Sequence, residues 1–186
     1  MEQIIQLNSN AKLSEHFTLG ELTKTSHKVY NIPSHEAIEN LKRVCEWLEY
    51  LRKRYKELNQ TTPGPSSLFE EGSTEGGFPS SWEEGKGVEE KALLPIIINS
   101  GYRSPQLNRK VGGAANSNHL TGCAVDIRVK NNEQLIQYAA ILIQYANETH
   151  QDFDELLLEK NRHGAIWLHF AVKPKDNRRH VMFLTV

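Results

Sequence analysis

Cysteine is scarce in this sequence. The chain has 186 residues and two cysteines, Cys45 and Cys123. Small domains that depend on disulfides carry several cysteine pairs, so a disulfide framework is excluded. Cys45 belongs to a series of apolar residues that recur at helical spacing, and we expect it to be a small core residue.

Long apolar runs and clusters of one charge are also missing. No apolar run approaches the about 20 residues that a membrane-spanning helix needs, so we expect no membrane span. The 22 Lys and Arg residues are scattered and nearly balance the 23 Asp and Glu residues, so nothing indicates a nucleic-acid partner. The N-terminus, MEQIIQLNSNAKLSEHF, lacks a basic segment followed by an apolar core. We therefore expect synthesis in the cytoplasm without a signal peptide.

The spacing of apolar residues predicts helices first and strands later. Thr18 and Glu21 have the spacing of a capping box for a short helix, and Ser34 can cap a long helix with an apolar stripe from Ile38 to Leu58. Further predicted elements are a helical turn at 106–110, a helix at 134–147, and strands at 94–99, 123–129, 153–158, 165–172 and 181–186. This order predicts an α+β fold, with N-terminal helices and a mostly antiparallel sheet crossed by one helix.

Residues 60–91 differ in composition from the rest of the chain. Gly, Ser, Pro and Glu dominate there, and no apolar periodicity is left. We interpret the chain as a single domain, 1–186, with a flexible insertion at about 60–91. The alternative is a lid in which Phe69, Phe78 and Trp82 cover a substrate groove. The sequence favours disorder, because nothing in it fixes these aromatic side chains.

Three residues form a candidate metal site: His119, Asp126 and His169. Alternation along the strands places Asp126 and His169 among apolar neighbours, where an unpaired imidazole or carboxylate costs on the order of a few kcal/mol. Two imidazoles and one carboxylate are a common catalytic zinc set, although non-haem iron uses the same donors. On these residues alone, a hydrogen-bonded core histidine and a strand-end aspartate are the commoner explanation.

Residues 117–126 read SNHLTGCAVD, with the spacing S-x-H-x-x-G-x-A-x-D. This segment fits the signature of the zinc D-Ala-D-Ala carboxypeptidase family, peptidase M15, which the chain resembles. Residues 100–104, SGYRS, are similar to the segment that precedes this signature, and residues 167–169, WLH, are similar to the W-x-H segment that supplies the last ligand. Residues 17–22, FTLGEL, resemble the start of the phage-type subgroup.

The resemblance implies a fold, a metal and an activity. It implies the hedgehog/D-Ala-D-Ala carboxypeptidase-like zinc peptidase fold, with zinc bound by His119, Asp126 and His169. It implies that Arg103 binds a carboxylate or carbonyl of the substrate, which suits the planar guanidinium. The implied activity is cleavage of peptidoglycan stem peptides, by a D-Ala-D-Ala carboxypeptidase or by an endolysin-type endopeptidase that acts at the cell wall if it is phage-derived.

The sequence departs from the family at the general base. Many relatives carry a glutamate three residues before the last histidine, and this chain has Ile166 there. Glu159 is our candidate for the base, since residues 153–159, FDELLLE, resemble F-D-Q-L-I-x-E of the subgroup. The competing interpretation is that Glu159 is a solvated turn residue. Asp154 is expected to be structural.

Two other functions remain open at this point. One is a non-catalytic, zinc-containing cell-wall-binding or phage structural protein, in which a fourth protein ligand such as Cys123 or His163 closes the site. The other is an iron oxygenase, for which the sequence shows no co-substrate motif. We expect a monomer, and the bond that is cleaved is not specified by the sequence.

Overall fold

The computed structural model describes residues 9–60 and 95–186. The predicted insertion and its aromatic residues Phe69, Phe78 and Trp82 therefore lie outside the described residues. The helices are α1 (Leu19–Thr23), α2 (His35–Gln60), α3 (Pro105–Lys110) and α4 (Asn132–Thr149), with a 3-10 helix, η2 (Asn118–Thr121). The strands are β1 (Ile98–Ser100), β2 (Ala124–Arg128), β3 (Glu155–Lys160), β4 (Ile166–Ala171) and β5 (His180–Thr185).

The N-terminal helices begin where the capping residues predict. Thr18 caps α1 in a complete capping box with Glu21. The Ser34 hydroxyl accepts a hydrogen bond from the Ala37 amide at the start of α2. The apolar stripe of α2 is buried against the rest of the chain, with Leu41, Leu48 and Leu51 fully inaccessible. None of the helices in the described parts is both long and apolar enough to cross a membrane.

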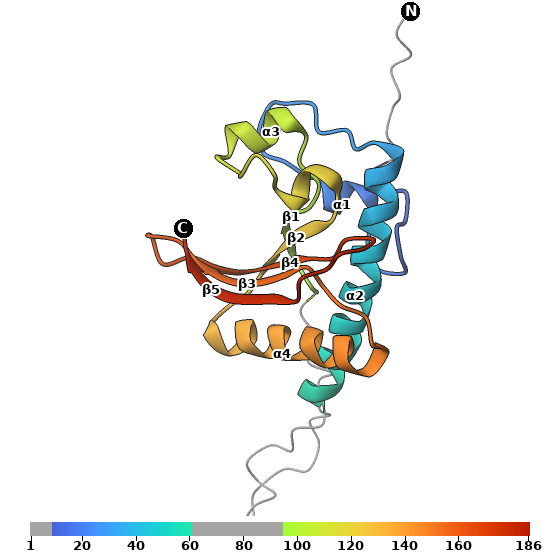
Figure 1. Cartoon of the computed structure of the whole chain (residues 1–186), viewed down its shortest axis with the longest axis vertical. Coiled ribbons are helices and arrows are strands. Elements are labelled where there is room, and N and C mark those ends of the chain that lie inside the picture. Colours follow the sequence, from blue (N-terminus) through green and yellow to red (C-terminus); the bar gives the residue numbers. More distant parts are fainter. Residues whose placement is uncertain (1–8, 61–94) are drawn as a thin grey trace, which may run out of the picture.

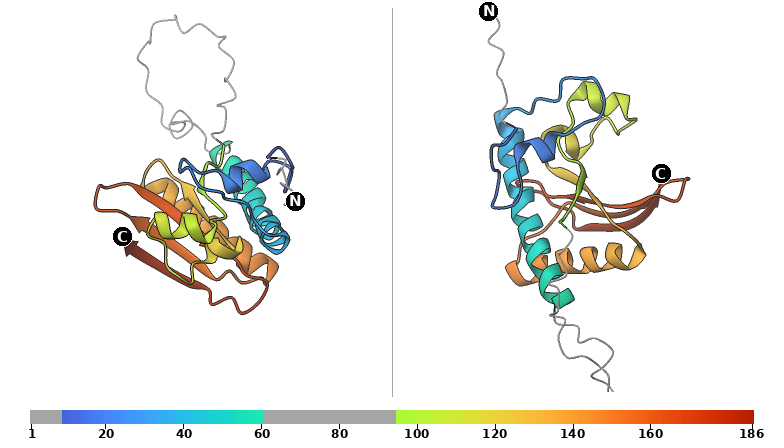
Figure 2. Two further views of the ribbon diagram at one scale, coloured as in Figure 1. Left: turned by 90° about the horizontal axis from the view of Figure 1, so that it is seen from above. Right: turned by 180° about the vertical axis from the view of Figure 1, so that it is seen from behind.

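The five strands form one sheet in the order β1-β2-β4-β3-β5. Neighbouring strands are antiparallel, except that β5 runs parallel to β3. Helix α4 lies along one side of the sheet and α2 crosses one end of it (Figure 1). The view from behind shows α3 on the side opposite to α4 (Figure 2). The predicted α+β fold with a mostly antiparallel sheet is confirmed.

The two faces of the sheet have different chemistry. Side chains on the face toward α4 are apolar and buried: Val125, Ile127, Leu156, Leu158, Leu168 and Phe170. Alternation places the intervening residues on the opposite face, and there Asp126 of β2 is directly paired with His169 of β4. The helices α2 and α4 therefore complete the core on one face and leave the other face for polar side chains.

Some boundaries differ from the prediction. The first strand was predicted at 94–99, but β1 is limited to Ile98–Ser100. The pairing of this edge strand with β2 also shifts register between Ile98 and Ser100, an irregularity that is common at sheet edges. Strand β3 extends to Lys160, so Glu159 lies within the strand rather than after it. His119 lies in the 3-10 helix η2, for which no element was predicted.

Candidate metal centre

The 3-10 helix η2 fixes the backbone of His119. The Ser117 hydroxyl caps the helix by accepting a hydrogen bond from the His119 amide. Gly122 ends it with a left-handed backbone, φ 73°. A Cβ atom at Gly122 would lie 2.4 Å from the carbonyl oxygen of Ala37 in α2, so glycine permits both the turn and the close packing of η2 on α2.

The segment that carries Arg103 fixes the ring of His119. The Gly101 carbonyl oxygen lies 2.6 Å from Nδ1 of His119, which must therefore donate its proton there. The Arg103 amide in turn donates to the His119 carbonyl over 3.0 Å. With Nδ1 acting as the donor, Nε2 presents a lone pair, and this nitrogen faces Asp126.

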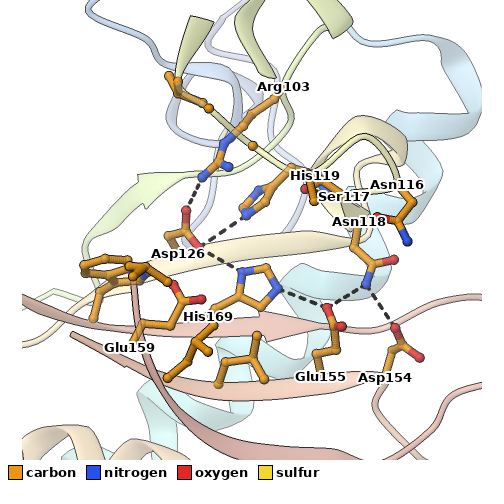
Figure 3. A pocket seen from close by; sticks show the side chains of 18 of the residues that line it. Arg103, Asn116, Ser117, Asn118, His119, Asp126, Asp154, Glu155, Glu159 and His169 are labelled. Carbon is orange, nitrogen blue, oxygen red and sulfur yellow. Dashed lines mark hydrogen bonds and ion pairs between the residues drawn. The ribbon is translucent and has the colours of Figure 1, made fainter. Parts of the chain in front are cut away.

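The two histidines and Asp126 converge on one point. Oδ1 of Asp126 lies 3.2 Å from Nε2 of His119 and 2.9 Å from Nδ1 of His169. One ligand atom from each residue lies within 4.8 Å of the other two, and all three residues are buried. Figure 3 shows the three side chains turned toward one another from η2, β2 and β4. The structure thus brings together the three ligands that were predicted.

Arg103 contacts the second oxygen of the same carboxylate. Its guanidinium forms an ion pair with Oδ2 of Asp126, and its Nε donates to the Ser100 hydroxyl over 2.8 Å. Arg103 also lines the cavity over the site. Its predicted contact with substrate stays a prediction, and the structure adds that Arg103 orients Asp126.

The charge states of Asp126 and His119 suit a cation, whereas His169 must lose a proton to bind one. Burial raises the pKa of Asp126, but the neighbouring imidazoles lower it by a larger amount. The net pKa is therefore well below the usual range. Burial lowers the pKa of His119 and favours the neutral ring that binds metals. Burial also lowers the pKa of His169, but Asp126 and Glu155 raise it to about 9. Two imidazole nitrogens share one buried carboxylate oxygen, and a carbonyl holds the other ring nitrogen of His119. This arrangement fits a zinc site with three protein ligands.

Glu159 lies beside the cluster on the same face of the sheet. It is paired across the strands with Trp167, two residues before His169. Its side chain is partly buried, and burial raises the pKa of its carboxyl group. Together with Arg103 and the three candidate ligands it lines a cavity of about 790 Å³ (Figure 3). Glu159 is therefore a strand residue facing the cavity, not a residue of a turn.

Neither proposed fourth ligand joins the metal group. In the described parts of the chain that group consists of His119, Asp126 and His169 alone. The Cys123 thiol points to the Thr121 carbonyl, 4.0 Å away. His163 is exposed in the turn between β3 and β4 and does not line the cavity.

A second polar cluster borders the site, and sequence reasoning assigned it no role in the site. Nε2 of His169 lies 3.4 Å from Oε2 of Glu155. The Asn118 amide group donates to Glu155 over 2.9 Å and to Asp154 over 3.0 Å. Asp154 is 1% exposed and is structural, as expected, since it binds the Arg178 guanidinium. Glu155 could have been found from its spacing, because alternation places it on the same face as Glu159.

Comparison with known proteins gives one family. A model of the family described as Peptidase M15 matches residues 71–162, about half of the chain. The matched range includes Arg103, His119, Asp126 and Glu159 but ends before His169. A search of curated proteins finds no match. The phage-type subgroup stays a prediction, whereas the family match, together with the three converging ligands, supports the M15 peptidase family and a peptidase activity for this chain.

Proposed function

We propose that this protein is a zinc-dependent peptidase that hydrolyses peptide bonds in peptidoglycan stem peptides. The observation that carries the proposal is the convergence of three ligand atoms, one each from His119, Asp126 and His169, within 4.8 Å of one another. They line a cavity of about 790 Å³ that Arg103 and Glu159 also line. The resemblance of the sequence to the zinc D-Ala-D-Ala carboxypeptidases supports the substrate class.

The donor atoms that would hold zinc follow from the hydrogen bonds. His119 would bind through Nε2, since its Nδ1 is engaged by the Gly101 carbonyl. Asp126 would bind through Oδ1, since Arg103 contacts Oδ2. His169 would bind through Nδ1, the nitrogen that faces Asp126. When bound, zinc supplies a Lewis acid that polarises the scissile carbonyl and lowers the pKa of water from 15.7 to roughly 7.

Glu159 is proposed as the general base in place of the glutamate that the sequence lacks at Ile166. Its carboxylate takes a proton from the attacking water and delivers it to the leaving amine. Partial burial raises the pKa of this carboxyl group, so it holds the transferred proton more readily than an exposed glutamate does. The Glu159 side chain is partly buried on the same face of the sheet as His169, and this position supports its role as the base.

Arg103 is proposed to orient the substrate. A guanidinium offers five donors, and here Ser100 and Asp126 engage only part of this set. The remaining donors can bind a carboxylate or a carbonyl of the peptide beside the metal. Such an anchor raises the rate by fixing the reacting groups in position.

The test is zinc content and turnover measured on the same preparation. We expect about one zinc per chain, and a defined cut in peptidoglycan fragments read by mass spectrometry. The product identifies the bond, and so separates a carboxypeptidase from an endopeptidase. His119→Ala is expected to lose both zinc and cleavage. A folded wild-type protein that takes up no zinc would contradict the proposed metal centre.

The second candidate is a non-catalytic zinc protein that binds the cell wall or belongs to a phage particle. Ile166 at the family's glutamate position is the feature that favours it. The position of Glu159 in the cavity counts against it. Zinc bound at one per chain, with no cut in any fragment, would favour this second function. In either case we propose the cell wall as the site of action.

A further inference from the structure

We propose that Glu155 is a positioning residue for the metal centre. Its carboxylate accepts a hydrogen bond from the Nε2–H group of His169 and thereby holds Nδ1 toward the metal. The inference rests on the proposed function, because it assigns His169 as a zinc ligand. It adds a residue outside the predicted ligand and base set.

The need for such a residue follows from the surroundings of His169. A neutral imidazole that binds a metal through Nδ1 must carry its proton on Nε2. Nε2 of His169 is buried, and within the described residues it has no partner that meets hydrogen-bond geometry. The carboxylate oxygen Oε2 of Glu155 lies 3.4 Å from it. A buried N–H group without an acceptor is costly. A small side-chain movement would let Nε2 of His169 donate a hydrogen bond to this oxygen.

Glu155 is itself held in place from two sides. Oε1 accepts a hydrogen bond of 2.6 Å from the Arg178 guanidinium, and Oε2 accepts one of 2.9 Å from the Asn118 amide group. Asp154 anchors both of these donors by its own hydrogen bonds to them. The carboxylate therefore does not need to be ordered when the metal binds.

Asn118 extends the cluster to the second histidine. It precedes His119 in η2, and its side chain bridges Glu155 and Asp154 at the start of β3 (Figure 3). The same carboxylate thus contacts the ring of His169 and, through Asn118, the helix that carries His119. Glu155 couples the positions of two ligands that come from different elements. Carboxylates that accept the second N–H of a metal-binding histidine typically alter metal affinity by roughly 10- to 100-fold.

The test compares zinc affinity in Glu155→Ala, Glu155→Gln and the matched control Asp152→Asn. Asp152 is an exposed carboxylate that binds Arg179 outside the cavity. We expect zinc binding, measured by competition with a chelator, to weaken by roughly 10- to 100-fold in Glu155→Ala. Glu155→Gln keeps an acceptor oxygen and should show a smaller loss, and Asp152→Asn should show none. Arg178 remains bound to Asp154 in these variants, so the fold should survive, which circular dichroism would check.

A spectroscopic readout separates positioning from a general structural effect. In zinc-loaded protein with ¹⁵N-labelled histidine, we expect His169 to be protonated at Nε2, with slow exchange of that proton in the wild type and faster exchange in Glu155→Ala. If the wild type binds zinc and Glu155→Ala binds it equally tightly with the Nε2 signal unchanged, the inference alone fails. If the wild type takes up no zinc, the inference and the proposed function fail together.

Discussion

At the scale of single residues, hydrogen bonds decide which atoms of the site are available. Gly101 engages Nδ1 of His119, and Arg103 engages Oδ2 of Asp126. Nε2 of His119 and Oδ1 of Asp126, which lie 3.2 Å apart, then face the same point. These two candidate ligands are therefore oriented before any cation arrives, which lowers the ordering cost of binding.

The role of Glu159 is a prediction at this scale. Glu159→Gln keeps the shape of the side chain but removes its ability to accept a proton. We expect zinc content to remain at the wild-type level while turnover falls by roughly 10²- to 10⁴-fold. Zinc quantification and cleavage of peptidoglycan fragments would measure the two quantities. Normal turnover by the zinc-loaded variant would exclude Glu159 as the base.

At the scale of elements, the site depends on how η2 packs on α2. Gly122 combines a left-handed backbone with a close approach to the Ala37 carbonyl. The Asn40 amide group of α2 also donates to the Thr121 carbonyl at the end of η2, over 2.9 Å. The long N-terminal helix therefore contributes no ligand but fixes the helix that carries His119.

Gly122→Ala tests this packing against Gly164→Ala. Both glycines have positive φ angles, 73° and 85°, so alanine costs about 1–2 kcal/mol of backbone strain at either position. Only Gly122 adds a steric clash, because a Cβ at Gly164 meets nothing within 4 Å. We expect Gly122→Ala to be the more destabilising by about 1–3 kcal/mol in denaturant unfolding, and to weaken zinc binding. Equal losses in the two variants would mean that η2 adjusts to the extra atom.

At the scale of the whole molecule, the N-terminal segment is tied to α2 by Glu49. Its carboxylate accepts hydrogen bonds from the Ser14 hydroxyl, 2.6 Å, and the His16 amide, 2.7 Å. Burial raises the pKa of Glu49, but the hydrogen bonds from these donors lower it by a larger amount. The net pKa therefore lies below the ordinary value of 4.5. A carboxyl group with a lowered pKa stabilises the folded state above its unfolded pKa and loses this contribution as the pH falls.

Glu49→Gln should therefore destabilise the protein in a pH-dependent way. Near pH 7 we expect a loss of about 1 kcal/mol in the free energy of unfolding, because hydrogen bonds to a charged acceptor become bonds to a neutral one. The difference from the wild type should shrink as the pH falls below about 4.5. Urea unfolding at several pH values would measure it. A difference that does not change with pH would show that the charge of Glu49 is unimportant.

Zinc is expected to stabilise the whole fold. A ligand that binds only the folded state adds about 2.7 kcal/mol when its free concentration is 100 times the dissociation constant. Chelation should therefore lower the melting temperature of the wild type, and zinc should restore it. His119→Ala should show no such response. A wild-type melting temperature that is independent of zinc would argue against the predicted site.

The sequence by itself determined the fold class, the helices and the candidate ligands. Apolar spacing located α2 and α4, and alternation placed Asp126 and His169 on polar positions of buried strands. These features are local, because periodicity depends only on neighbouring residues. The site itself was predicted from the resemblance of two segments to a known family, the signature around His119 and the segment of Arg103. The structure shows these two segments in contact.

Only the tertiary structure decided how these residues meet. The parallel pairing of β5 with β3, the contact of Arg103 with Asp126 and the approach of Glu155 to His169 all join residues far apart in the chain. The apolar periodicity of the sequence cannot predict such contacts, since they depend on strand order and register. The cavity that contains Glu159 arises in the same way, from strands and loops that converge on one face of the sheet.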